Sequence, residues 1–190
     1  MTKAPVEKNG LKKEPRPVKK AQPATPTLAG LSEALEELEA NPGYQSFKRD
    51  NHEYHLAHAF SMHKPGAAPD WQVGLYSPKT GKVVVFKTGP VEQLPAEEAF
   101  TKGEAVKRLD LALVTLDPER AEERALAVKE KERPGEIVTK VIVILQHLDR
   151  QVYNVTLVTA AFNILNVRVD AASGEVVSSQ VRSIMSLRRE

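Results

Sequence analysis

Four histidines close together are the side chains of this sequence that could do chemistry. His52, His55, His58 and His63 lie within twelve residues, and His147 is the fifth histidine. Neutral imidazole is a common ligand of zinc, copper and nickel. Side chains alternate between the faces of a strand, so His52 and His58 would share one face and His55 and His63 the other. We therefore expect surface histidines on a strand, with metal binding by the His52–His63 cluster as an alternative.

The other side chains show no pattern that is typical of an enzyme. The segment His52-Glu53-Tyr54-His55 is one residue short of the H-E-x-x-H zinc motif. The chain has no cysteine, which excludes thiolate nucleophiles, disulfides and zinc–thiolate sites. It also has no nucleophile elbow, no phosphate-binding glycine loop and no pair of acids at a diagnostic spacing. We expect a protein that is not an enzyme and that has no cofactor and no metal site.

Charge is distributed unevenly along the 190 residues, whose formal net charge is +2. Residues 1–27 carry two glutamates, five prolines and seven cationic side chains, namely Lys3, Lys8, Lys12, Lys13, Arg16, Lys19 and Lys20. Such a segment buries too little apolar surface to offset the entropy of ordering it. The sequence predicts a disordered basic tail, which either keeps the protein soluble or serves as an electrostatic arm for nucleic acid or an anionic membrane.

No part of the chain has the composition of a membrane span. No apolar run approaches the ~20 residues that cross a bilayer. No apolar stretch follows the basic N-terminus, so no secretory signal is recognised. With Met1 as the first residue, we expect a cytoplasmic location.

Spacing predicts the elements of the first half. Leucines three and four residues apart indicate a helix over residues 28–40, which Asn41-Pro42-Gly43 is expected to end. Alternating side chains predict strands over residues 53–62, 71–76 and 82–87. A hairpin loop joins the last two, and Thr80-Gly81 closes it because glycine supplies a positive φ. A connection with a helical turn over residues 95–100 is expected to follow.

The second half begins with a strong helix signal. Asp117-Pro118-Glu119 combines an N-cap residue, a first-turn proline and a first-turn acid, and it predicts a helix to about residue 131. An extended segment is expected before it, over residues 109–114. Strands are expected after it, over residues 137–145, 152–160, 162–169 and 175–184, with a bulge near residues 160–161 as an alternative to a turn.

An internal repeat organises these elements. Residues 76–84 align with residues 169–177 at an offset of 93 residues, and the two predicted helices lie at a similar offset. Helices followed by hairpin-linked strands indicate the α+β class, with a helix on one face of an antiparallel sheet. We therefore predict two related units, residues 28–91 and residues 92–190.

The second unit resembles a PepSY domain. The resemblance rests on four segments: Asp117-Pro118-Glu119-Arg120-Ala121, Pro134-Gly135-Glu136-Ile137-Val138, Gln151-Val152-Tyr153-Asn154-Val155, and Asn166 to Val177 with its closing Asp170-Ala171-Ala172-Ser173-Gly174-Glu175. It covers about residues 112–182. The first unit matches more loosely, and the tandem is similar to the architecture of beta-lactamase-inhibitor-like and cystatin-like proteins.

The resemblance implies a regulatory, inhibitory or interaction role without catalysis, and a protein or peptide as the partner. Turn chemistry explains Asp170, Ser173 and Gly174, since Asp170 can accept loop N–H groups in front of the glycine. A calcium site there would need more oxygen ligands than Asp170 and Glu175 supply. Trp71, Tyr76 and Phe86 are candidates for an aromatic partner surface, with a place in the core as the alternative.

Overall fold

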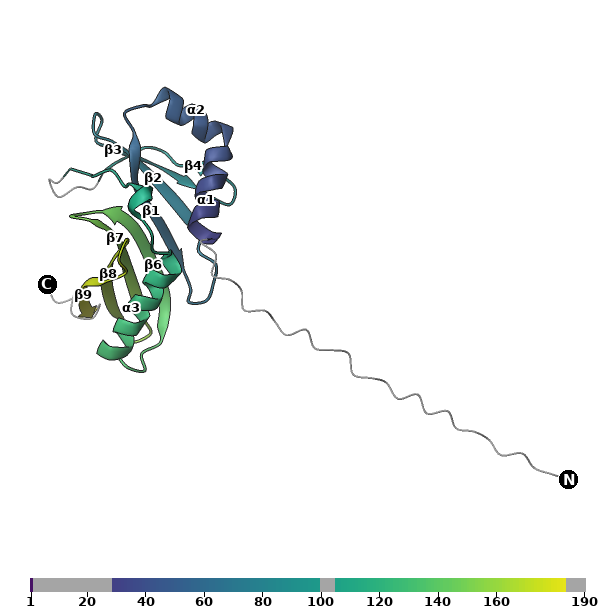
Figure 1. The fold of residues 1–190 in the computed structure, drawn as a ribbon, viewed down its shortest axis with the longest axis vertical. Coiled ribbons are helices and arrows are strands. Elements are labelled where there is room, and N and C mark those ends of the chain that lie inside the picture. The colour runs from purple at the N-terminus through teal and green to yellow at the C-terminus, as the bar shows by residue number, and fades with distance from the viewer. Residues whose placement is uncertain (2–28, 100–104, 184–190) are drawn as a thin grey trace.

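The computed structural model describes Met1, residues 29–99 and residues 105–183. These residues form three α-helices and nine strands of one antiparallel sheet, which confirms the α+β class (Figure 1). The predicted tail, apart from Met1, lies outside the described residues. The elements are α1 (Ala29–Ala40), α2 (Pro42–Asp50), β1 (His55–His63), β2 (Trp71–Ser77), β3 (Lys82–Lys87), β4 (Glu92–Gln93), β5 (Glu97–Glu98), a 3-10 turn η1 (Leu111–Leu113), α3 (Pro118–Glu132), β6 (Val138–His147), β7 (Gln151–Thr159), β8 (Asn163–Asp170) and β9 (Val176–Ser183).

The sheet runs in the order β4-β3-β2-β1-β6-β7-β8-β9, with β5 also paired to β3. Every neighbour in this order is antiparallel. The central pair is β1 with β6, whose register runs from His58 opposite Gln146 to His63 opposite Val141. This pair joins strands that are about 80 residues apart in the chain, so the two halves share one sheet.

All three helices pack on the same face of the sheet. One apolar cluster contains Leu31 of α1 and Ala121 and Ala125 of α3, together with buried strand residues such as Val143 and Val155. A second cluster joins the α1–α2 corner to β2 and β3. Small side chains on the inner face of α3 let the helix lie close to the sheet, where each buried methylene contributes about 0.8 kcal/mol.

Helix α2 corrects the prediction for residues 41–43, which were expected only to end the first helix. The Asn41 side chain accepts a hydrogen bond from the N–H of Tyr44 at 3.1 Å, so it caps a new helix. Pro42 occupies the first turn, where its missing N–H costs nothing. Asn41 and Pro42 therefore end α1 and also begin α2.

Two further segments differ from their predictions, and at a third the structure decides between a turn and the alternative bulge. Residues 111–113 form a 3-10 turn, capped by the Asp110 side chain, within the segment predicted to be extended. The segment expected to hold a helical turn contributes β4 and β5 to the sheet edge, and residue 100 lies outside the described residues. The chain reverses at Ala160–Phe162, where Phe162 has a φ of 59°, so β7 and β8 form a hairpin without the alternative bulge.

The repeat alignment is not matched by the topology of the sheet. At an offset of 93 residues it pairs the β2–β3 hairpin with the β8–β9 hairpin. The helices lie on one face of the sheet, and the central strands β1 and β6 are antiparallel. Two similar halves in such a sheet can be related only by a two-fold rotation about an axis that passes between β1 and β6 and is normal to the sheet. This rotation superposes the β2–β3 hairpin on the β7–β8 hairpin. The two aligned hairpins share a turn type, and they do not occupy equivalent places.

Tyr153→Phe is expected to lower the free energy of unfolding by about 1–2 kcal/mol, measured by urea denaturation. Tyr153 is fully buried, and its hydroxyl donates a hydrogen bond to the carbonyl of Leu116 at 2.7 Å, just before α3. The substitution removes the donor and keeps the ring. Tyr76→Phe is the control, because no hydrogen bond of the Tyr76 hydroxyl occurs among the described residues, and equal losses in the two variants would contradict the assignment.

Candidate functional site

The predicted histidine cluster is divided between two faces of the sheet. A β-bulge between Leu56 and His58 shifts the alternation of β1 by one residue. As a result, His55 stacks edge-on against Tyr76 and His58 lies over Gly74, both on the face away from the helices. His63 points to the helix face, and His52 is exposed in the preceding turn. The predicted pairing of His52 with His58 and of His55 with His63 is therefore wrong.

No metal centre forms from these residues. Within the described parts of the chain, no group of three or more histidine, aspartate or glutamate side chains is arranged to hold an ion. Burial lowers the pKa of His58, and it also lowers that of His55, so both imidazoles are neutral at pH 7. A neutral ring is the form that packs over the Cα of Gly74.

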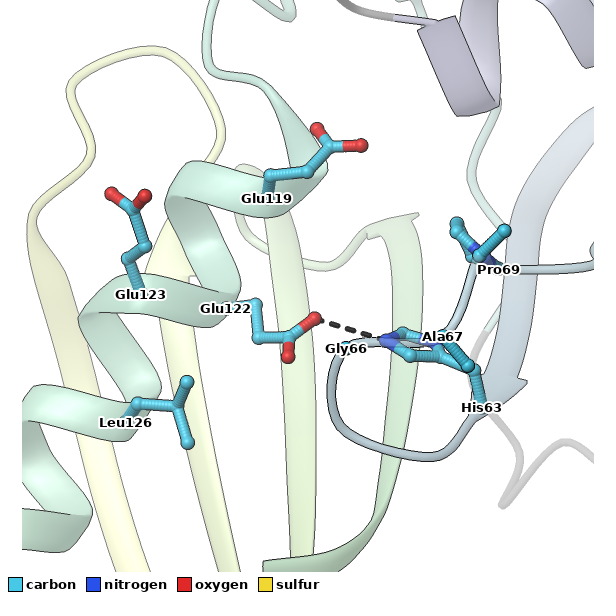
Figure 2. Close-up of a pocket in the computed structure, with 9 residues that line it drawn as sticks. His63, Gly66, Ala67, Pro69, Glu119, Glu122, Glu123 and Leu126 are labelled. Atoms are coloured by element: carbon cyan, nitrogen blue, oxygen red, sulfur yellow. Dashed lines mark hydrogen bonds and ion pairs between the residues drawn. The ribbon is translucent and has the colours of Figure 1, made fainter. Parts of the chain in front are cut away.

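His63 is the middle member of a polar chain that links β1 to α3. Its Nδ1 lies 3.3 Å from the Ser61 hydroxyl, and its Nε2 lies 3.0 Å from Glu122 Oε2 (Figure 2). The order serine, histidine, carboxylate is that of a hydrolase triad. Ser61, however, is 0% exposed, so no substrate reaches its hydroxyl. The chain of contacts positions α3 against β1.

A cavity of about 370 Å³ opens beside this pair, between α3 and the β1–β2 loop. Figure 2 shows Glu119 and Glu122 pointing from α3 toward the loop that carries Pro69. Leu126 lines the cavity as its apolar member from α3. Sequence reasoning missed this site because His63 and Glu122 are 59 residues apart and only the fold brings them together.

The aromatic residues proposed as a partner surface do not form one. Trp71 is 2% exposed and Phe86 is 1% exposed, and each belongs to a core cluster. Tyr76 is half-buried on the opposite face of β2. Side chains alternate between the two faces along β2 and β3, and the large ones point into the core. Trp71 and Phe86 therefore lie in the core, as the alternative prediction had it.

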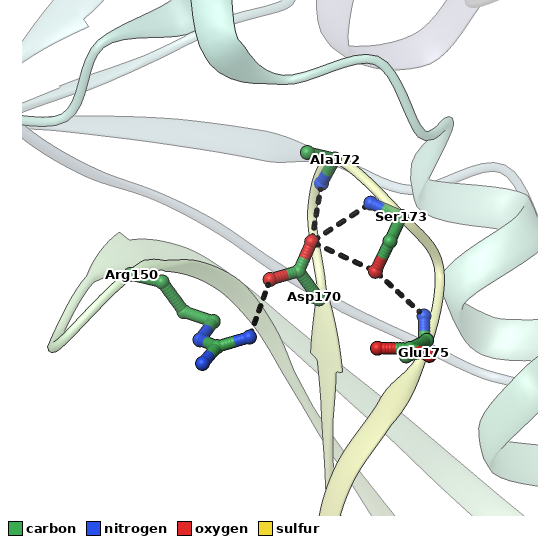
Figure 3. A network of polar contacts seen from close by, with 5 residues as sticks. All are labelled: Arg150, Asp170, Ala172, Ser173 and Glu175. Carbon is green, nitrogen blue, oxygen red and sulfur yellow. Dashed lines mark hydrogen bonds and ion pairs between the residues drawn. The ribbon is translucent and has the colours of Figure 1, made fainter.

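Asp170 organises the last hairpin through its carboxylate (Figure 3). Its Oδ1 accepts the backbone N–H groups of Ser173 at 2.7 Å and Ala172 at 3.0 Å, and the Ser173 hydroxyl at 3.1 Å. Arg150 approaches the other oxygen at 3.4 Å. The backbone N–H of Ser173, followed by the other donors, lowers the pKa of the Asp170 carboxyl. Gly174 takes a φ of 74° and closes the turn.

The equivalent positions of the β2–β3 loop make the same turn. Gly81 has a φ of 70°, and its N–H donates to the Ser77 carbonyl at 2.9 Å, as that of Gly174 does to the Asp170 carbonyl at 2.9 Å. The N–H of Thr80 donates to the Ser77 hydroxyl at 3.3 Å. These contacts are structural, and no ligand-binding geometry accompanies them.

The two edges of the sheet differ in length and in charge. At one edge, β4 and β5 have two residues each, and Lys87 and Glu92 form an ion pair there at 3.0 Å. At the other edge, β9 has eight residues, of which Arg182 is the charged one, and it contains no proline. Val176 and Val177 are 42% and 48% exposed. Among the described residues, no strand pairs with the outer side of β9.

Comparisons with known proteins identify no family. No protein-family model matches the chain, and no curated protein matches it. The fold was matched to the crystal structure of a candidate lipoprotein from Clostridium difficile 630, with 16% identity and a TM-score of 0.47 over 74% of this chain and 90% of that one.

That structure is described as a lipoprotein, and the cytoplasmic location expected from the sequence is withdrawn. No other location is put in its place. Separately, no helix in the described parts of the chain is long and apolar enough to cross a membrane.

Gly74→Ala is expected to destabilise the fold by about 1–3 kcal/mol, because the added Cβ would collide with the His58 imidazole. Combining it with His58→Ala should recover most of the loss, since the small side chain clears the space. Urea denaturation of the four proteins gives the coupling free energy. Additive losses would show that His58 does not lie over Gly74.

Asp170→Asn is expected to reduce stability at pH 7, and this difference is expected to shrink as the pH falls from 4 toward 2. A carboxyl whose pKa is lowered on folding stabilises the protein above its unfolded pKa of about 3.9, and that contribution is lost as the pH falls through the folded value. Denaturation midpoints of both proteins between pH 7 and pH 2 test this. Asp149→Asn, in the exposed β6–β7 turn, is the control. A difference that stays constant over this range would contradict the assignment.

Proposed function

We propose that the protein is a non-enzymatic interaction module of PepSY type that binds an extended segment of a protein partner along β9. The observation that carries the proposal is the outer edge of β9 from Val176 to Arg182, which is nearly uncharged and partly apolar and with which no strand of the described residues pairs. Such an edge offers backbone N–H and C=O groups to an added strand. Exposed edges are commonly protected by lysine, proline, a β-bulge or a covering segment. Of these, β9 has a bulge at Val177, and its pairing with β8 is regular from Ser178 onward.

The proposed module consists of two related units that follow the basic tail, residues 1–27. The first unit is α1, α2 and β1 to β5, and the second is α3 and β6 to β9. The pairing of β4 and β5 with β3 favours a boundary after β5, in place of the predicted boundary between residues 91 and 92. In this proposal a two-fold axis between β1 and β6 relates the units, and β9 corresponds to the short β4 and β5 of the first unit.

Helix α3 holds β9 in position. It contacts β7, β8 and β9, and its Glu132 accepts a hydrogen bond from the Ser179 hydroxyl at 2.6 Å. Val181 packs against the main apolar cluster. The edge strand is therefore held in an extended shape before a partner arrives, which reduces the entropy that binding must offset.

The two other functions considered from the sequence lack such an observation. A nucleic-acid arm would use the basic tail, which lies outside the described residues apart from Met1. A metal protein would use His52 to His63, which the bulge in β1 divides between two faces.

Peptides selected from a random twelve-residue library on the full chain should bind along β9. We expect Val177→Lys to weaken them by roughly tenfold or more, about 1.4 kcal/mol, because an edge lysine opposes strand addition. Fluorescence anisotropy with a labelled peptide measures the dissociation constant.

Ile137→Lys is the matched control, since Ile137 is another exposed apolar residue, at 71%, outside β9. Equal urea midpoints for the two variants exclude unfolding as the cause. Peptides that bind both variants as tightly as the wild type would overturn the assignment to β9.

A further inference from the structure

An acidic groove lies between the first turns of α1 and α3. The cavity of about 370 Å³ beside His63 adjoins a second one of about 420 Å³, and both are lined by Ala68, Pro69 and Glu119. We call the two together the acidic groove. Carboxylates line it from both helices and from the β1–β2 loop, namely Glu33, Glu37, Asp70, Glu119, Glu122 and Glu123, and the lining includes no lysine and no arginine.

Half of these carboxylates are already engaged. Glu37 accepts the N–H of Gly89, Glu122 contacts His63, and Glu123 pairs with Arg120. No hydrogen bond or ion pair from the described residues engages Glu33, Asp70 or Glu119, and all three are exposed. A segment that carries several positive charges would complement them.

The groove also holds a buried donor with no acceptor. Trp71 lines it, and among the described residues its indole Nε1 has no hydrogen-bond partner, although Trp71 is only 2% exposed. A Cβ atom added to Gly30 would lie 3.0 Å from Nε1 of Trp71 and 3.7 Å from Oε1 of Glu119. Buried donors in proteins are almost always satisfied, so this one points to an acceptor that enters through the groove.

We propose that the acidic groove binds the chain's own basic segment, residues 12–20, Lys-Lys-Glu-Pro-Arg-Pro-Val-Lys-Lys. Its cations face Glu33, Asp70 and Glu119, and one of its backbone carbonyls accepts the indole N–H of Trp71. Pro15 and Pro17 favour an extended backbone whose carbonyls make no internal hydrogen bonds, which leaves an acceptor free.

Position along the chain favours this occupant over a separate basic peptide. Helix α1 begins at Ala29, and Gly30 lines the groove. Lys20 precedes Gly30 by ten residues, which extend to at most ~35 Å, so the segment can return to the groove. A tether of this length gives an effective concentration in the millimolar range, which few free peptides reach. Docking would compete with any anionic partner for the same cations.

The single tryptophan and the absence of cysteine make the contact measurable in the full chain. Val18→Cys carries a nitroxide spin label, and the indole N–H of Trp71 gives one resonance in an ¹⁵N spectrum. We expect strong paramagnetic broadening of that resonance at low salt. It should be lost in 1 M salt, where the Debye length is about 3 Å, and in the double variant Glu33→Gln with Glu119→Gln.

Glu97→Gln with Glu98→Gln is the control, because it removes the same charge from the exposed β5. Broadening that is absent at low salt, or that survives neutralisation of the groove, would overturn the proposal. Broadening in a mixture of labelled ¹⁴N protein and unlabelled ¹⁵N protein would assign the groove to a second copy, and would overturn binding within one chain.

Discussion

The pairing of β1 with β6 is the interaction on which the rest of the structure depends. It converts two sets of strands into one sheet, and it lets α1 and α3 share one apolar cluster. Without it, the first half would be two helices on five strands and the second half one helix on four strands, and β1 and β6 would each become an exposed edge. The same pairing fixes where the two remaining edges lie. One is blunted by the two-residue strands β4 and β5, and the other is the full length of β9.

Local chemistry explains which parts of the fold could be predicted from the sequence. Asp117-Pro118 begins α3 with proline in the first turn, although the Asp117 side chain makes no capping hydrogen bond. The strands β2 and β3 lie close to their predicted bounds, because they depend on alternation and a glycine turn within a few residues. Asn41-Pro42 was harder, since the same residues that end a helix also begin one. The bulge at Ala57 and the contact of His63 with Glu122 depend on partners far along the chain, and no local pattern announces them.

The two matching hairpins show how a sequence repeat differs from a structural one. Gly81 and Gly174 adopt nearly the same φ and make the same backbone hydrogen bond, so the similarity of their sequences has a physical cause. That cause is the turn alone. The order and direction of the strands relate β2–β3 to β7–β8, whose turn at Ala160–Phe162 has a different sequence. The residues of a tight turn are determined by the backbone conformation of that loop alone. Similar turn sequences therefore do not show that two hairpins occupy equivalent positions in the sheet.

Helix α3 connects the two surfaces for which binding is proposed, and it also keeps them apart. Its first turn places Glu119 in the acidic groove, and its last turn places Glu132 on Ser179 of β9. Fifteen residues at 1.5 Å each give a helix about 22 Å long, nearly three times the Debye length of about 8 Å at physiological salt. A charge change at one end therefore has little direct electrostatic effect at the other. The two surfaces can be altered independently, and any coupling between them would have to pass through the packing of α3 on the sheet.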